Sequence, residues 1–178
     1  MLFKLALLSL KTEIFIRVKA HEVKDIYEFE PLELRIVQLL QEDASLSHAE
    51  LAERVGSSPA SCWRRIRALE AAGVLSSVVR LVNPARIGRG VNVICNIRVR
   101  SHSREVRGPF EEFVRSRPEV MECYSMSGEW DYLLRIVAAD VADYEAFLMG
   151  TLLDHPSVGG AASHFALSTT KYTTALPI

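Results

Sequence analysis

Three stretches in the first half of the chain repeat apolar residues at the spacing of one helical face. The first follows Pro31, a residue suited to the first turn of a helix, and its apolar positions are Leu32, Ile36, Leu39 and Leu40. The second opens with the capping-box pattern of residues 47–50, and the third opens at Ser58 and Pro59. We therefore predict three helices, at about residues 31–41, 48–55 and 59–72.

The third predicted helix carries signals at both ends. Ser58 precedes a proline, which pushes its backbone into the extended region that an N-cap needs. Gly73 can adopt the left-handed conformation of a Schellman cap, with Leu69 and Val74 in contact. A narrow apolar stripe between these caps leaves several arginines on the outer face. Alone, such a face more often belongs to a solvated surface helix, but a capped helix and a glycine turn precede it, which is typical of a helix-turn-helix motif.

Six residues of this helix and its N-cap are our candidates for DNA contact: Ser58, Ser61, Trp63, Arg64, Arg65 and Arg67. Arg64 is the strongest candidate for reading a base, because arginine can pair with guanine through two hydrogen bonds. Two alternatives stay open: Arg65 could brace the helix, and Trp63 could be partly packed. After Gly73 a β-branched run predicts a strand or small wing over residues 74–82, and Asn83 and Pro84 then mark a turn.

The second half of the chain changes to the period of a β-strand. Apolar and polar residues alternate from Val91 to Arg100, as in a half-buried strand. The elements expected after it are a helix from Pro109 to Arg117, strands at 120–127 and 131–138, a helix capped by Asp140, and a last strand from Ser163 to Leu167. The order βαββαβ, with 85–90 taken as linker, predicts a ferredoxin-like sheet with helices on one face. A homodimer would cover the other face.

Charge is distributed unevenly along the chain, although the formal net charge is only −1. Residues 59–90 hold six arginines and a single glutamate, whereas from residue 91 onward the acidic residues outnumber the basic ones. A basic segment followed by an acidic one indicates two different functions. Only the first segment has the positive charge that favours binding to nucleic acid.

The three cysteines are scattered and form no C-x-x-C pair, so neither a disulfide framework nor a zinc site is indicated. A reducing cytoplasm fits best. An apolar run opens the chain, but charged residues follow at once, no small-residue cleavage site is evident, and the run is shorter than the roughly 20 apolar residues that cross a bilayer. We expect no secretion signal and no membrane span, and residues 1–27 stay unassigned.

Several motifs occur in an order that is specific in combination. They are IVQLLQEDA (36–44), AELAERVG (49–56), the serine-proline to WRR stretch (58–65), LEAAGV (69–74), SGEWDY (127–132) and KYTT (171–174). Together they make residues 29–177 resemble the Lrp/AsnC family of bacterial and archaeal transcription regulators. Residues 1–27 have no counterpart in this resemblance.

The resemblance implies a winged helix-turn-helix DNA-binding domain at 28–82, a linker at 83–90 and a ferredoxin-like effector-binding and dimerisation domain at 91–178. It implies double-stranded DNA as a partner, homodimers that often assemble into octamers, and an effector that is commonly an amino acid. We expect no cofactor. The effector would bind near a turn whose candidate residues are Ser127, Gly128, Glu129 and Asp131. Such a turn can offer backbone N–H groups to a carboxylate, and Asp131 could accept an ammonium, but a plain hairpin turn is an equal alternative.

Two departures from the family pattern matter. Glu30 and Glu33 stand where aspartates are usual, and Trp130 could narrow an effector pocket. Siroheme decarboxylases resemble the same two-domain family, so an enzyme is the alternative function. Those enzymes look to need histidine and tyrosine near the second sheet strand and an arginine-rich tetrapyrrole pocket. Here residues 122–125 contain no histidine, and the histidines of the chain are scattered singly. We therefore predict no catalytic residues, no metal site and a regulator, not an enzyme.

Overall fold

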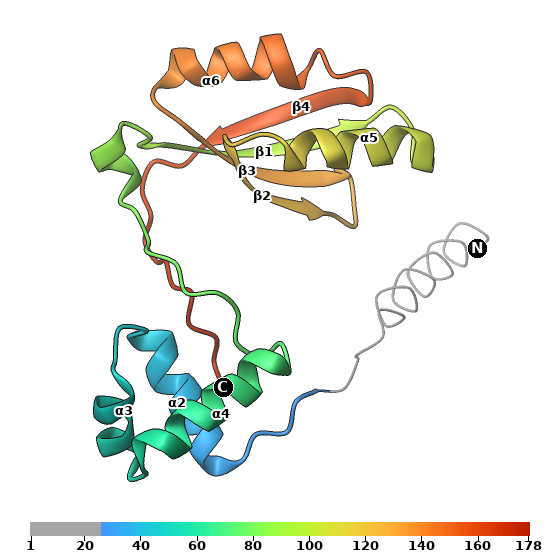
Figure 1. Ribbon diagram of the computed structural model, residues 1–178. Coiled ribbons are helices and arrows are strands. Elements are labelled where there is room, and N and C mark those ends of the chain that lie inside the picture. Colours follow the sequence, from blue (N-terminus) through green and yellow to red (C-terminus); the bar gives the residue numbers. More distant parts are fainter. Residues whose placement is uncertain (1–25) are drawn as a thin grey trace, which may run out of the picture. The chain divides into compact units, whose positions relative to one another are not determined.

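A computed structural model describes residues 26–178, which divide into two compact units (Figure 1). One unit holds the helices that precede Arg80 together with Lys171–Ile178, and the other is Leu81–Thr170. Sequence analysis assigned residues 171–178 to the second domain, whereas the structure groups them with the first. The proposed extension 1–27 lies outside the described residues except for its last two.

The first unit contains three helices, which agree with the three predicted ones. They are α2 (Pro31–Glu42), α3 (His48–Val55) and α4 (Pro59–Ala71). Their inward faces form one small core, whose buried members are Ile36, Leu51, Ala52, Val55 and Cys62. Each helix is too short to be stable alone, so this shared apolar core is what holds the three together.

The caps of these helices form as predicted. The Ser47 side chain accepts a hydrogen bond from the backbone N–H of Glu50 at 3.2 Å, which is half of a capping box. At the end of α4, Gly73 has φ 73° and donates to the Glu70 carbonyl, while Val74 donates to the Leu69 carbonyl at 2.9 Å. These two bonds are the Schellman pattern, so the helix ends where the sequence requires.

The strand expected over 74–82 does not form. These residues belong to no ladder within the described chain, and the valines and leucine at 78–82 are more than 60% exposed. A β-branched run favours the extended backbone but needs a partner for its N–H and C=O groups before it becomes a strand. The linker that follows contains a short 3-10 helix, η1 (Pro84–Ile87).

The second unit has the predicted order βαββαβ. Its elements are β1 (Val91–Val99), α5 (Arg104–Arg115), β2 (Val120–Ser125), β3 (Tyr132–Ala138), α6 (Val141–Phe147) with the π-helical turn η2 (Leu148–Leu152), and β4 (Val158–Phe165). The four strands are antiparallel and lie in the order β2-β3-β1-β4. This is the expected ferredoxin-like sheet.

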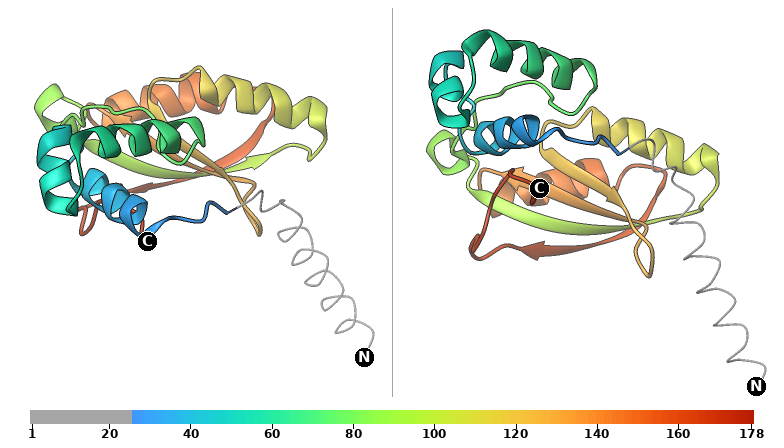
Figure 2. Two further views of the ribbon diagram at one scale, coloured as in Figure 1. Left: turned by 60° about the horizontal axis from the view of Figure 1, so that its bottom comes forward. Right: turned by 90° about the horizontal axis from the view of Figure 1, so that it is seen from below.

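Both helices of this unit lie on one face of the sheet (Figure 2). Alternate residues of β1 and β3 point to that face and are buried with the helices, among them Cys95, Ile97 and Leu134. The other face is covered by no helix of the unit. Apolar side chains on it are Ile94, Tyr124, Leu133, Val137 and Ala162.

Two predicted boundaries in this unit were wrong. Helix α5 begins at Arg104, not at Pro109, which lies inside it. The helix starts earlier because Val106 and Phe110 both face the core, one turn apart. Strand β4 begins at Val158, not at Ser163. The prediction missed its first residues because two glycines interrupt the alternation of apolar and polar residues that marks a strand. A Cβ on Gly159 would meet the Arg98 carbonyl oxygen at 3.3 Å, a tight contact with the backbone of β1.

Candidate DNA-binding and effector sites

Helix α4 is fixed at its start by its N-cap. The Ser58 hydroxyl accepts the backbone N–H of Ser61 at 3.2 Å, and Pro59 occupies the first helical position. Gly56, with φ 69°, ends the preceding helix in the left-handed conformation and makes the turn between the two helices. The hydroxyl of Ser58 is therefore engaged in capping, whereas Ser61 lies within the first turn.

Arg64 is exposed and has no acidic partner within the described chain. Its neighbour Arg67 is also exposed, but it forms an ion pair with Glu70 at 2.9 Å. The Arg67 guanidinium also lies 6.0 Å from the centre of the Trp63 ring, which is about half exposed. The sequence prediction that Trp63 could be partly packed agrees with this contact.

Arg65 points in a different direction and braces the helix. Its guanidinium lies 2.6 Å from a carboxylate oxygen of Glu30 and 3.3 Å from one of Glu33. Glu33 is buried, and it also accepts the Tyr27 hydroxyl at 3.2 Å. The side chain of Arg65 is only 23% exposed, so this cluster ties α4 to the start of α2.

The outer face of α4 thus presents a free guanidinium beside a paired one and a half-exposed indole. Guanidinium groups contact phosphate oxygens and can bind guanine through two parallel hydrogen bonds. A helix of this kind, held by a second helix across a tight turn, has the form that enters a major groove. Of the six candidate residues, Ser61, Trp63, Arg64 and Arg67 lie together on α4, whereas Arg65 is directed to the two glutamates at the start of α2.

The predicted effector turn connects β2 and β3, as expected. Gly128 has φ 138°, a conformation open to glycine, and Ser127, Gly128 and Glu129 are exposed. Asp131 is largely enclosed: one carboxylate oxygen accepts the backbone N–H of Val99 at 2.8 Å, and the other lies 3.2 Å from Nδ1 of His102. A ligand ammonium at Asp131 would therefore compete with His102.

Trp130 does not point freely into solvent. The Arg98 guanidinium lies 4.9 Å from the centre of the Trp130 ring and pairs with the Glu129 carboxylate at 3.0 Å. Both side chains of the turn are thus held against β1 by one arginine. Ser127, Gly128 and Glu129 nevertheless remain exposed, whereas Trp130 is half-buried.

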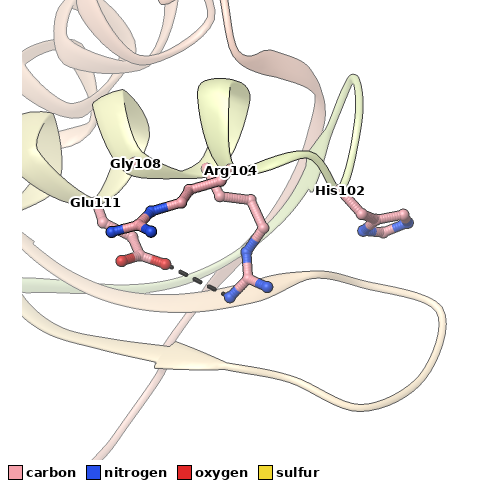
Figure 3. A pocket seen from close by; sticks show the side chains of 5 residues that line it. His102, Arg104, Gly108 and Glu111 are labelled. Atoms are coloured by element: carbon pink, nitrogen blue, oxygen red, sulfur yellow. Dashed lines mark hydrogen bonds and ion pairs between the residues drawn. The ribbon is translucent and has the colours of Figure 1, made fainter.

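A pocket of about 260 Å³ opens at the start of α5 (Figure 3). Its lining residues are His102, Arg104, Arg107, Gly108 and Glu111. His102 is shared with the effector turn, because it contacts Asp131. The pocket is mixed in charge, with basic side chains from Arg104 and Arg107 and one carboxylate from Glu111, in the second turn of the helix.

One wall of this pocket is a hydrogen-bonded cluster. The Tyr132 hydroxyl accepts from Arg107 at 2.9 Å and donates to Glu111 at 2.7 Å. Burial raises the pKa of Tyr132, so its hydroxyl stays protonated and can donate. Arg104, in contrast, has no acidic partner in the described part of the chain.

Sequence reasoning missed the pocket residues. A helix that begins at Pro109 leaves Arg104 and Arg107 in the preceding loop. The sequence therefore did not place these two arginines on the same helix as Glu111. A serine three residues before Val106, with Glu105 in the first turn, was the available signal for an earlier start.

Residues 26–178 were found to contain neither a metal-ligand cluster nor a helix of membrane-spanning length. No three His, Cys, Asp or Glu side chains in that range are grouped so as to hold a metal ion. No helix in the same range has the length and apolar character needed to cross a bilayer.

A capped, arginine-bearing second helix and a separate four-stranded α+β domain with a polar pocket define a class of protein: a DNA-binding regulator with a small-molecule domain. Residues 29–76 match the family model of a winged helix-turn-helix DNA-binding domain, and residues 92–176 match that of the Lrp/AsnC ligand binding domain. The chain belongs to the Lrp/AsnC family.

Curated relatives are transcriptional regulators. The glutamate uptake regulatory protein of Zymomonas mobilis is 37% identical over 153 residues, which are 86% of this chain and 93% of that protein. The DNA-binding transcriptional activator DecR of Escherichia coli is 37% identical over 147 residues, which are 83% of this chain and 97% of that protein. No finding among these relatives favours the decarboxylase alternative.

Solved structures agree with this assignment. A transcriptional regulator from Neisseria meningitidis, solved as an L-Met complex, has a TM-score of 0.81 and 36% identity, covering 84% of this chain and 97% of its own. An AsnC family regulator from Agrobacterium tumefaciens has a TM-score of 0.80 and 42% identity over the same shares.

Proposed function

We propose that this protein is a sequence-specific DNA-binding transcriptional regulator in which Arg64 of α4 reads a base in the major groove. The observation that carries the proposal is the pairing of the three α4 arginines. Arg65 and Arg67 are bound to carboxylates, whereas Arg64 is exposed with no acidic partner in the described chain. Ser58, Ser61, Trp63 and Arg67 would add contacts around it, mainly to the phosphate backbone.

The working unit is a homodimer that joins through the open face of the sheet, and octamers are its further assembly. Supporting this, that face carries Ile94, Leu133 and Val137 beside polar residues, and no helix of the unit covers it. A two-fold axis would present two α4 helices to half-sites about 34 Å apart. The absence of paired cysteines in the described chain is compatible with action in the cytoplasm.

The effector is a small molecule of the amino-acid class, bound near Ser127, Gly128, Glu129 and Asp131. The L-Met complex of the Neisseria relative supports this class. In this chain the turn offers backbone N–H groups to a carboxylate, and Asp131 would accept the ammonium after His102 moves away.

Binding to fragments of the protein's own promoter, compared with scrambled DNA, tests the role of Arg64. Arg64→Ala should weaken specific binding by roughly 1–3 kcal/mol and relax preference at one position, since a base contact is lost. Arg115→Ala, an exposed arginine of the other unit, is the matched control and should bind normally. If Arg64→Ala binds both DNAs like the unaltered protein, Arg64 is not a base reader.

Calorimetric titration with the individual amino acids tests the effector site. Asp131→Asn should abolish or strongly weaken binding of whichever amino acid binds, because the ammonium loses its charged partner. Glu145→Gln, on the exposed surface of α6, serves as the control. Equal affinities for the unaltered protein and Asp131→Asn would place the ligand elsewhere.

A further inference from the structure

Two glutamines of α2 bind the backbone of a segment that lies more than 130 positions away in the chain. The Gln41 side chain accepts the backbone N–H of Leu176 at 2.7 Å and donates to the Leu176 carbonyl at 3.3 Å. Gln38, one turn earlier, donates to the carbonyl of Ile178 at 2.9 Å. A side-chain amide carries both a donor and an acceptor, so Gln41 pairs with an extended residue as a neighbouring strand would.

The docking uses backbone groups and few apolar contacts. Leu176 is 70% exposed and Ile178 is 46% exposed, so neither side chain is an anchor. Ala175, which is half-buried, is the exception. A contact of this kind is weak between separate molecules, but it is populated when both partners belong to one chain, because the connecting chain keeps their effective concentration high.

Chain connectivity gives this contact its consequence. The chain leaves the DNA-binding unit after Arg80, forms the whole sheet unit, and returns at Lys171. We propose that residues 171–178 are a second tether of the DNA-binding domain, held on α2 by Gln38 and Gln41. The two domains are then joined by two stretches of chain, the linker after Arg80 and the stretch that follows β4.

A second tether limits how far the DNA-binding domain can swing about its linker. The linker alone is exposed and makes no ladder among the described residues, so one connection would leave a wide range of orientations. Binding two half-sites requires one orientation of each domain, and restricting the alternatives beforehand lowers the cost of binding. This last consequence rests on the proposed DNA binding, whereas the docking itself does not.

Hydrogen exchange of the full-length protein tests the docking. Gln41→Leu keeps the size of the side chain and the helix propensity but removes both bonds to Leu176. The backbone amide of Leu176 should be protected in the unaltered protein and exchange at least about threefold faster in Gln41→Leu. Glu42→Leu, the next residue on α2 and exposed, is the matched control and should leave this exchange unchanged. An unprotected Leu176 amide in the unaltered protein, or equal effects of the two variants, would overturn the proposal.

Distances between the domains test the tether. Spin labels at Glu53 and Glu145, both exposed, would be introduced with Cys123 replaced by serine, and excess unlabelled chain would remove pairs between subunits. The distribution of distances should broaden in Gln41→Leu and in a variant lacking residues 175–178, but not in Glu42→Leu. Equal widths in all four proteins would refute the second tether. Neither measurement needs DNA. Failure of the protein to bind its promoter would refute the proposed function, whereas the exchange and distance measurements would still test the tether.

Discussion

Replacing Arg65 with methionine should destabilise the DNA-binding domain by roughly 2–3 kcal/mol, whereas Arg64→Ala should change its stability by less than about 0.5 kcal/mol. The two arginines are neighbours on α4, yet only Arg65 is enclosed. Its guanidinium joins the buried carboxylate of Glu33 and the exposed carboxylate of Glu30. Methionine retains the apolar stem, so the substitution removes mainly the charge and its hydrogen bonds.

The magnitude follows from what each carboxylate loses. A hydrogen bond to a charged group contributes about 1.5–3 kcal/mol, and the bond to Glu33, whose side chain is 9% exposed, falls in that range. Glu30 is 65% exposed at its side chain, so its pair with Arg65 adds only about 0–1 kcal/mol. The loss stays below the roughly 3–5 kcal/mol of a fully broken buried pair, because the Tyr27 hydroxyl and the Glu30 backbone N–H still bind Glu33.

Urea denaturation followed by tryptophan fluorescence is the assay. The chain has two tryptophans, so Trp130→Phe leaves Trp63, on α4, as the reporter of the DNA-binding domain. A loss of 2–3 kcal/mol corresponds to a decrease of roughly 10–20 °C in the melting temperature of a domain of this size. A double-mutant cycle with Glu33→Gln then isolates the coupling between the two residues.

DNA affinity measured at a temperature where all variants are folded separates the two roles. Arg64→Ala should lose DNA affinity while its stability is unchanged. Arg65→Met should lose stability while its DNA affinity is unchanged. The reasoning fails if Arg65→Met is as stable as the unaltered protein, or if the cycle gives no coupling between Arg65 and Glu33. It also fails if Arg65→Met weakens DNA binding as much as Arg64→Ala does.

Three further outcomes are expected. Gly73→Ala should destabilise the DNA-binding domain by about 1 kcal/mol in urea denaturation, because Gly73 has φ 73°, whereas Gly108→Ala inside α5 should be neutral or stabilising. Leu134→Ala should lower the stability of the sheet domain by roughly 2–5 kcal/mol in calorimetry, since Leu134 is fully buried, and a smaller loss would mean that the core closes around the gap. Burial and, next, the positive charge of Arg117 lower the pKa of His155 below its ordinary value of 6.5, so the unfolded chain takes up the proton first as pH falls. The free energy of unfolding should therefore decrease as pH is lowered through 6.5 towards the pKa of the folded state, and His155→Gln should reduce that slope in denaturation series at several pH values.

The helices of the first domain were predictable because their signals are local. The bond of Ser58 to Ser61 and the bonds that end α4 at Gly73 join residues at most five positions apart. A capping serine or a left-handed glycine therefore acts in nearly the same way in any protein. The family resemblance rests on the same local motifs.

The roles of the α4 arginines could not be assigned by pattern alone. Arg64, Arg65 and Arg67 are one residue type on one helix, and what separates them is the position of their partners. Glu30 and Glu33 lie 35 and 32 positions before Arg65, so only the folded domain brings them to it. Sequence analysis accordingly left both a DNA contact and a brace open for Arg65.

Elements that depend on distant partners were predicted least well. The run at 74–82 has the residues of a strand but pairs with no other segment of residues 26–178. Strand β4 forms despite two glycines because β1 lies beside it. The hold of Gln41 on Leu176 joins residues 135 positions apart and has no signature in either residue. Local backbone preference therefore determines where the three helices of the first domain start and stop. The start of α5, the strand pairing, the pocket and the docked segment depend on groups that only the tertiary fold brings together.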